Sequence, residues 1–174
     1  MASGSDPEVE FSEFTAAHVD GLRRLGFLLC GDQHAAEDAV QQTLIRLYAV
    51  WHRTRSETAN AYARRILINV IRTEHSRAWY RRVFIGRSIP DGPAVSDTDG
   101  ASDRMTVLAA LARLPRRQRA VVVLRFWEDR SVAETAAIMR CSVGTVKSQS
   151  AKGLAALRAI LADTYSTKEG LLPI

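Results

Sequence analysis

The sequence predicts an all-α protein of two small helical domains joined by a flexible linker. Apolar residues recur at helical spacing along most of the 174-residue chain, and no segment of more than a few residues alternates apolar with polar side chains. The stretch 86–103 interrupts this periodicity, because it is rich in Gly, Pro, Ser and Asp and has too few large apolar side chains to offset the entropy of ordering. Since 47% of the residues are hydrophobic, the parts before and after this stretch have enough apolar side chains to form a core.

This break sets the expected domain boundaries. Each flanking part is short for an isolated domain but strongly periodic. We expect five segments, namely a disordered N-terminus at 1–9, a first domain at 10–85, an acidic linker at 86–103, a second domain at 104–162 and a C-terminal tail at 163–174.

The first domain is predicted to contain three helices, near 10–29, 34–51 and 59–82. Gly31 suits the C-terminal stop of the first helix, because glycine adopts the left-handed conformation that ends a helix. The stretch 56–60 begins with a serine and ends with an asparagine, which are residues that cap the N-terminus of a helix.

The second domain is predicted to contain four shorter helices. Pro115 fits the first turn of one of them. Ser131 and Glu134 have the spacing of a capping box, and Ser142 is a natural N-cap for the last helix. The four helices are expected near 104–113, 115–127, 132–140 and 143–161.

The formal charge alternates along the chain. Three arginines and eight acids give residues 1–52 a charge of −5, and eight arginines and two acids give residues 53–82 a charge of +6. One arginine and four acids give residues 83–103 a charge of −3, and twelve bases and five acids give residues 104–174 a charge of +7. Two of these segments therefore suit a polyanion such as nucleic acid.

Several classes of protein are not expected. The N-terminus has no basic patch followed by an apolar run, and no apolar stretch approaches the roughly 18 residues of a membrane span, so we expect a cytoplasmic protein with no membrane partner. The two cysteines, Cys30 and Cys141, have no neighbour at metal-ligand spacing. The four histidines are scattered, and the chain has no glycine-rich phosphate loop or nucleophile elbow. We therefore expect no enzyme activity, no small-molecule substrate, no cofactor and no metal.

The helix at 34–51 has two contrasting faces. Its apolar stripe, predicted to be core, holds Ala36, Val40, Leu44, Leu47, Tyr48 and Trp51. The opposite face lacks the Lys, Glu and Arg of a typical solvated face, and mixed amide, carboxylate and branched apolar groups suit a protein interface. A slightly apolar surface helix is the alternative. The candidate docking residues are Asp38, Gln41, Gln42, Ile45 and Ala49.

The helix at 59–82 has a polar stripe that ends among aromatic residues. Arginine, a hydrogen-bonding amide and accessible aromatic rings together suit phosphate binding and stacking on unpaired bases. Periodicity alone does not separate this reading from an arginine-rich solvated face whose tryptophan packs back on the domain. The candidate DNA-binding residues are Arg65, Asn69, Arg72, Ser76, Trp79, Tyr80 and Arg81.

The segment 131–153 is the strongest local signal, because it has the pattern of a helix-turn-helix. Small residues at Ala136, Ala137 and Gly153 would let two helices cross closely. Short hydroxyls near a helix N-terminus reach base edges, and basic residues contact phosphates. A plain helical hairpin is the alternative. The candidate DNA-binding residues are Arg116, Arg117, Arg119, Ser142, Gly144, Thr145, Lys147, Ser148, Gln149 and Lys152.

Four blocks of sequence together resemble the bacterial extracytoplasmic-function sigma factors, above all the short actinobacterial subgroup often called the SigE family. The blocks are DAVQQTL at 38–44, ARRILIN at 63–69, LPRRQR at 114–119 and SVGTVKS at 142–148. In order and spacing the resemblance covers roughly residues 10–162.

The resemblance implies two helical domains, called region two and region four, that bind core RNA polymerase and direct it to promoters. The helix at 34–51 would then dock on the polymerase clamp, and the helix at 59–82 would read and melt the minus-ten element, with Asn69 near a flipped base. The helix-turn-helix would read the minus-thirty-five element. Many members of the family are held by an anti-sigma protein, so the resemblance admits such a partner here.

One departure from the family affects promoter choice. Its recognition helix often reads Lys-Ser-Arg, whereas this chain has Lys147, Ser148 and Gln149. The missing arginine removes a phosphate or guanine contact, so the promoter sequence of relatives does not transfer. The alternative function is a stand-alone regulator that binds an operator as a dimer. It would explain 104–161 but neither of the unusual faces of the first domain.

Overall fold

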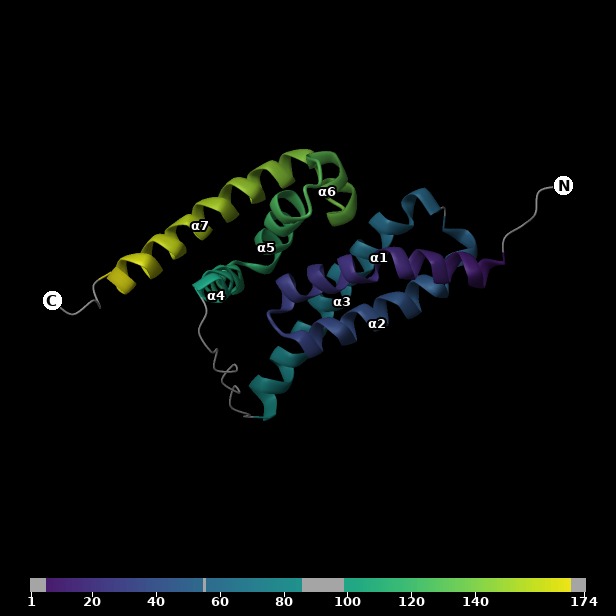
Figure 1. Ribbon diagram of the computed structural model, residues 1–174, viewed down its shortest axis with the longest axis horizontal. Coiled ribbons are helices and arrows are strands. Elements are labelled where there is room, and N and C mark those ends of the chain that lie inside the picture. Colours follow the sequence, from purple (N-terminus) through teal and green to yellow (C-terminus); the bar gives the residue numbers. More distant parts are fainter. Residues whose placement is uncertain (1–5, 55, 86–98, 170–174) are drawn as a thin grey trace.

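The structure of the protein is a computed structural model that describes residues 6–54, 56–85 and 99–169, with side chains described at 6–54, 58–73 and 104–166. These residues form helices and no strand, which confirms the all-α fold (Figure 1). The first half holds α1 (Pro7–Cys30), α2 (Gln33–Tyr48), the short 3₁₀ helix η1 (Trp51–Arg53) and α3 (Ser56–Ile85). The second half holds α4 (Asp99–Arg113), α5 (Arg116–Val122), the π-helical turn η2 (Val123–Trp127), α6 (Val132–Met139) and α7 (Val143–Glu169).

Helices α1, α2 and α3 form a bundle around fully buried leucines, among them Leu22, Leu47 and Leu67. Each such side chain contributes about 1.5–3 kcal/mol by leaving water. The loop between α1 and α2 follows its local sequence. Gly31 ends α1 at φ 73°, and the Asp32 side chain caps α2 by accepting a hydrogen bond of 2.7 Å from the Ala35 backbone.

The ends of several helices differ from the sequence-based expectation. Helix α1 begins at Pro7 rather than near residue 10, because the Asp6 side chain caps it and proline is favoured in a first turn. Helix α4 begins at Asp99, inside the segment expected to be linker. Helix α7 continues to Glu169, beyond the expected helix end near 161, and no glycine or proline lies between residues 154 and 169. The rest of the expected linker, 86–98, lies outside the described residues.

The second half is built around the crossing of α5 and α7. A Cβ atom on Gly153 of α7 would lie 2.6 Å from Cγ2 of Val122 on α5, so only glycine permits this approach. The small residue predicted to allow a close crossing therefore does so, but against α5. Ala136 and Val146 of the helix-turn-helix form a separate small core with Val121 of α5.

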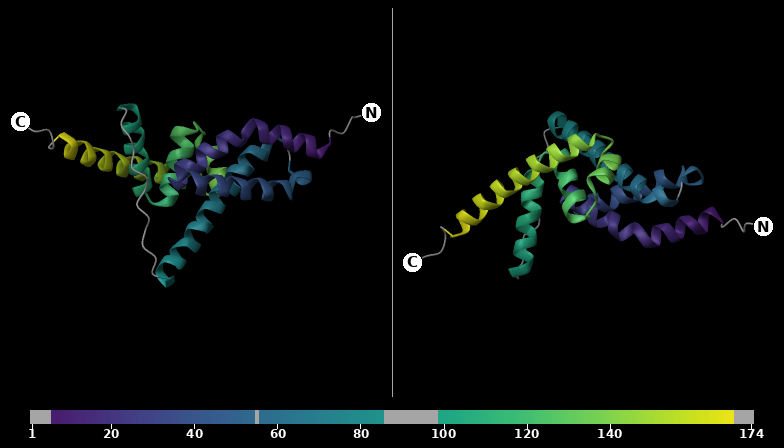
Figure 2. Two further views of the ribbon diagram at one scale, coloured as in Figure 1. Left: turned by 60° about the horizontal axis from the view of Figure 1, so that its bottom comes forward. Right: turned by 90° about the horizontal axis from the view of Figure 1, so that it is seen from above.

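The two halves pack against each other. A continuous cluster of buried apolar residues runs from α1–α3 into α5, η2 and α6. Helix α6 faces α3, while α7 extends away from the first bundle (Figures 1 and 2). The guanidinium of Arg64 on α3 forms a two-bond ion pair with Glu128, at 2.5 Å and 3.1 Å. Sequence periodicity predicted the helices on each side of this contact but not the contact itself.

Candidate protein and nucleic-acid interfaces

The predicted docking face of α2 is largely exposed. Asp38, Gln41 and Ala49 lie at the surface, Gln42 is half-buried, and Ile45 has 70% of its surface exposed. Tyr48 departs from the expected core stripe: its ring packs edge-on against Phe11 at 4.9 Å between centroids, yet 48% of the residue is exposed. Since residues three apart share a helix face, these two exposed apolar side chains adjoin each other.

The first three candidates of the basic stripe on α3, namely Arg65, Asn69 and Arg72, lie where the structure describes side chains. The guanidinium of Arg65 lies 4.7 Å from the centre of the Tyr62 ring, which fixes its direction by a cation–π contact. Asn69 and Arg72 are exposed one and two turns further along. Four other candidates belong to α3 but lie where no side chain is described, namely Ser76, Trp79, Tyr80 and Arg81.

The first helix of the helix-turn-helix is held by reciprocal capping. The Ser131 hydroxyl accepts a hydrogen bond of 3.1 Å from the Glu134 backbone, and the Glu134 carboxylate accepts one of 2.8 Å from the Ser131 backbone. These bonds lower the pKa of Glu134, the backbone bond most of all. The helix ends at Met139, and its C-cap Arg140 has a left-handed φ of 49° that turns the chain toward α7.

The second helix of the motif presents the predicted polar face. The Ser142 hydroxyl accepts a hydrogen bond of 3.0 Å from the Thr145 backbone and so caps α7. Val146 is fully buried, which orients the rest of the helix. The exposed candidates are Ser142, Gly144, Lys147, Ser148 and Lys152, and the half-buried ones are Thr145 and Gln149.

One candidate departs from the expected phosphate-binding role. Arg119 is only 8% exposed, and its guanidinium donates hydrogen bonds to the backbone oxygens of Leu29, Ala112 and Leu114 at 2.7, 2.5 and 3.3 Å. Burial lowers its pKa, and the charge of nearby Arg116 lowers it further. In this structure Arg119 therefore ties α5 to the end of α1, whereas Arg116 and Arg117 are exposed.

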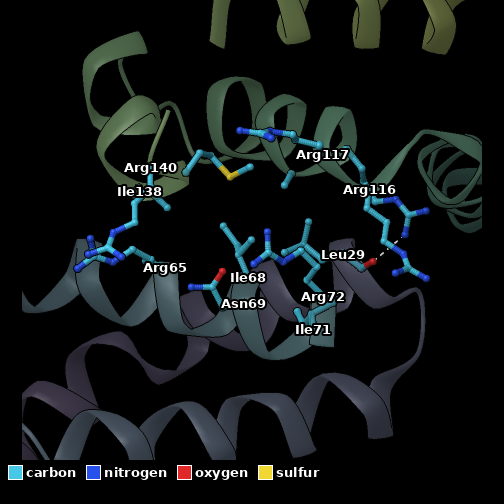
Figure 3. A pocket seen from close by; sticks show the side chains of 13 residues that line it. Leu29, Arg65, Ile68, Asn69, Ile71, Arg72, Arg116, Arg117, Ile138 and Arg140 are labelled. Atoms are coloured by element: carbon cyan, nitrogen blue, oxygen red, sulfur yellow. Dashed lines mark hydrogen bonds between the residues drawn. The ribbon is translucent and has the colours of Figure 1, made fainter. Parts of the chain in front are cut away.

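The structure brings candidates from both halves to a common cavity of about 350 Å³. Arg65, Asn69 and Arg72 lie along one side of it, and Arg116 and Arg117 lie along the other (Figure 3). Sequence reasoning placed these residues on two separate surfaces and did not foresee that they face each other.

The ion pair between the halves was also missed. Arg64 and Glu128 are 64 positions apart, and their side chains are 8% and 11% exposed. Asn60, one turn before Arg64, accepts a further hydrogen bond from its guanidinium. The available signal was an arginine on the same helix face as Leu67 and Ile71, which is unusual for an unpaired charge.

Comparison with known proteins identifies the family. The family described as Sigma-70 region 2 matches residues 14–81, and the one described as Sigma-70, region 4 matches residues 104–157. The chain is 38% identical over 151 residues to the RNA polymerase sigma-E factor of Streptomyces coelicolor, covering 86% of this chain and 85% of that protein. It is 30% identical over 160 residues to the ECF RNA polymerase sigma factor SigL of Mycobacterium tuberculosis, covering 87% and 88%. The chain belongs to the extracytoplasmic-function (ECF) RNA polymerase sigma factors.

Solved structures show the same fold for this sigma factor. The sigma factor RpoE of Bartonella quintana, solved with the anti-sigma factor NepR, aligns with a TM-score of 0.76 at 24% identity over 88% of this chain and 97% of that one. CnrH, solved with the cytosolic domain of CnrY, aligns with a TM-score of 0.68 at 23% identity over 93% and 92%.

The family membership decides between the two functions considered from the sequence. This sigma factor directs RNA polymerase to promoters and is not a stand-alone regulator. The matched families describe transcription initiation factors rather than enzymes. Among the described residues, no helix is long and apolar enough to cross a membrane, and no three potential metal ligands lie together.

Proposed function

We propose that this sigma factor works through three surfaces that the described residues present, one for core RNA polymerase and two for promoter DNA. The α2 face defined by Asp38, Gln41, Gln42, Ile45 and Ala49 docks on polymerase. The observation that carries this assignment is the 70% exposure of Ile45 beside half-exposed Tyr48. Exposed apolar side chains surrounded by amides and a carboxylate are typical of a surface that a protein partner covers.

The exposed stripe of α3 contacts the minus-ten element. Arg65 and Arg72 bind phosphates, and Asn69 hydrogen-bonds the edge of an unstacked base. The remaining members proposed for this surface extend the stripe along the same helix, namely Ser76, Trp79, Tyr80 and Arg81. An aromatic side chain that stacks on a released base contributes about 1–3 kcal/mol per base, which is the source of the energy for melting.

The N-terminal turns of α7 enter the major groove of the minus-thirty-five element. The capping of α7 by Ser142 and the buried Val146 support this placement, because they aim Gly144, Lys147 and Ser148 outward together. Lys152 and the exposed Arg116 and Arg117 contact phosphates and set the register. Arg119 is left out of this surface because of its burial.

The two DNA surfaces act together only when the halves separate. In the structure the α3 stripe faces Arg116 and Arg117 of α5 across the shared cavity, so these members of the two DNA surfaces point toward each other rather than toward separate promoter elements. We infer that polymerase holds the halves apart and raises the effective concentration of each module at its element. The protein would act in the cytoplasm. Its two domains would be those expected at 10–85 and 104–162, with the helical residues at 7–9, 99–103 and 163–169 added to them.

An anti-sigma factor is a further proposed partner. The Bartonella quintana sigma factor of the same fold was solved with one. Such a partner would prevent initiation by covering the docking face of α2 or by holding the DNA surfaces away from the promoter.

The docking assignment is tested by Ile45→Asp. Because the substitution places a charge at the centre of the proposed contact, we expect binding to core RNA polymerase to weaken by tenfold or more, measured by fluorescence anisotropy of labelled protein. Arg46→Gln is the matched control, since Arg46 is the neighbouring exposed residue and lies outside the proposed contact. Equal affinity of Ile45→Asp and the native protein would remove α2 as the docking face.

A further inference from the structure

The cavity between α3 and the α5–α6 pair is lined by arginines from both halves. Arg65 and Arg72 come from α3, Arg116 and Arg117 from α5, and Arg140 from the end of α6 (Figure 3). None of the described residues that line it is acidic. An anion bound among these guanidinium groups would accept charge-assisted hydrogen bonds from both halves.

One arginine of the lining is buried and has an unsatisfied donor. Arg119 also lines the cavity and is 8% exposed, and its Nε has no hydrogen-bond partner. Its other nitrogens already donate to backbone oxygens of α1 and of the α4–α5 region. Burial and the neighbouring charge of Arg116 both lower the pKa of Arg119.

Apart from Asn69, the lining other than the arginines is apolar, and this limits the kind of ligand that the cavity can hold. Leu29, Ile68 and Ile71 line the side of the first half, and Ile138 and Met139 line the opposite side. A simple inorganic anion would leave these side chains without contact. A nucleobase stacks on arginine and apolar side chains, while guanidinium groups bind phosphates through paired hydrogen bonds. The volume of about 350 Å³ falls within the roughly 300–1,000 Å³ of small-molecule sites.

We propose that this cavity binds a nucleotide carrying two or more phosphates, with its phosphates between the arginines of the two halves and its base on the apolar side chains. A compact ligand fits this space better than a continuous nucleic-acid strand, because helices of both halves bound it. The bound nucleotide bridges the halves and stabilises the closed state, in which the two halves are in contact as in this structure.

The consequence for transcription rests on the proposed function, whereas binding does not. Arg65, Arg72, Arg116 and Arg117 belong to the proposed DNA surfaces, so an occupied cavity withholds them from the promoter. The nucleotide therefore competes with promoter DNA for these arginines, and it binds the closed state selectively.

Binding is measured on the full chain alone by isothermal titration calorimetry at constant ionic strength, with no polymerase or DNA present. The probes are ATP, inorganic tripolyphosphate, AMP and orthophosphate. We expect one ATP per chain, weaker binding of tripolyphosphate, and at least tenfold weaker binding of AMP and orthophosphate. The result of this experiment does not depend on the proposed function, because neither polymerase nor DNA is present.

Variants on the two sides of the cavity test whether both halves contribute. Arg65→Gln and Arg140→Gln remove one arginine from each side, and each should weaken ATP binding at least fivefold. Arg46→Gln is the control, because it removes an equal charge from an exposed position on α2 that does not line the cavity. Equal loss in all three variants would show general attraction to a basic protein and overturn the proposal. Loss on one side alone, or binding of a short single-stranded oligonucleotide without binding of ATP, would also overturn it.

Discussion

Substituting Glu128→Gln should destabilise the protein and loosen the contact between its halves. The Glu128 carboxylate accepts two hydrogen bonds from Arg64, at 2.5 Å and 3.1 Å, and the two side chains are 8% and 11% exposed. Removing one partner of such a buried pair costs about 3–5 kcal/mol, because the other charge stays buried. Asn60 still accepts a hydrogen bond from Arg64, and a glutamine oxygen still accepts one. We therefore expect a loss below that range, about 2–3 kcal/mol.

Urea unfolding and thermal melting measure this change. For a chain of this size, about 2–3 kcal/mol corresponds to a fall in Tm of roughly 4–12 °C. Small-angle scattering should show a larger radius of gyration, since the pair joins α3 to the second half. The control is Asp20→Asn, which removes an exposed ion pair with Arg23 at 3.2 Å and should cost no more than about 1 kcal/mol.

A double-mutant cycle separates the pair from its surroundings. Once Glu128→Gln has removed the carboxylate, Arg64→Met should cost far less than it does in the native protein, because the buried charge leaves as well. If Glu128→Gln lowers stability no more than Asp20→Asn, or if the two substitutions are additive, the pair does not hold the halves together.

Three further predictions concern single positions. Asn69→Ala should slow formation of the open promoter complex, measured by permanganate footprinting, while core polymerase binding stays within twofold of native; equal loss of both would refute the base contact. Lys152→Ala should weaken DNA binding on all sequences and lower the slope of log affinity against log salt concentration by about 1. The control Arg158→Ala, further along α7, should leave this slope as it is in the native protein. An unchanged slope for Lys152→Ala would count against the phosphate contact. Gly153→Ala should destabilise the protein by about 1–2 kcal/mol in urea unfolding, because a clash with Val122 outweighs the gain of about 1 kcal/mol in helix propensity. Adding Val122→Ala should restore part of the lost stability. A Gly153→Ala protein more stable than the native one would contradict the close crossing.

Local signals predicted much of the fold. Gly31, the Ser131–Glu134 capping box and Ser142 marked helix ends that the structure has, because each acts through hydrogen bonds or backbone conformation within a few residues. The same kind of signal, Asp6 before Pro7, marks the start of α1 and was overlooked in a segment expected to be disordered.

Helical periodicity does not predict contacts between residues that are far apart in the sequence. Arg119 lies in a run of arginines that all read as phosphate ligands, and only the packing of α5 on α1 brings it to the Leu29 carbonyl. The pairing of Arg64 with Glu128 likewise depends on how the two halves meet. The candidate faces of α2 and α7 could be predicted because each lies on one helix, whereas the cavity shared by α3, α5 and α6 could not.

The central claim is that two helical modules recognise separate promoter elements only when core RNA polymerase holds them. Run-off transcription from a library of promoter fragments, with purified core polymerase and with or without this sigma factor, tests it most directly. The account predicts defined transcripts from a subset of fragments only when the sigma factor is present, and no selective binding of intact duplex by the sigma factor alone. Failure to associate with core polymerase, or selective duplex binding without it, would contradict the account.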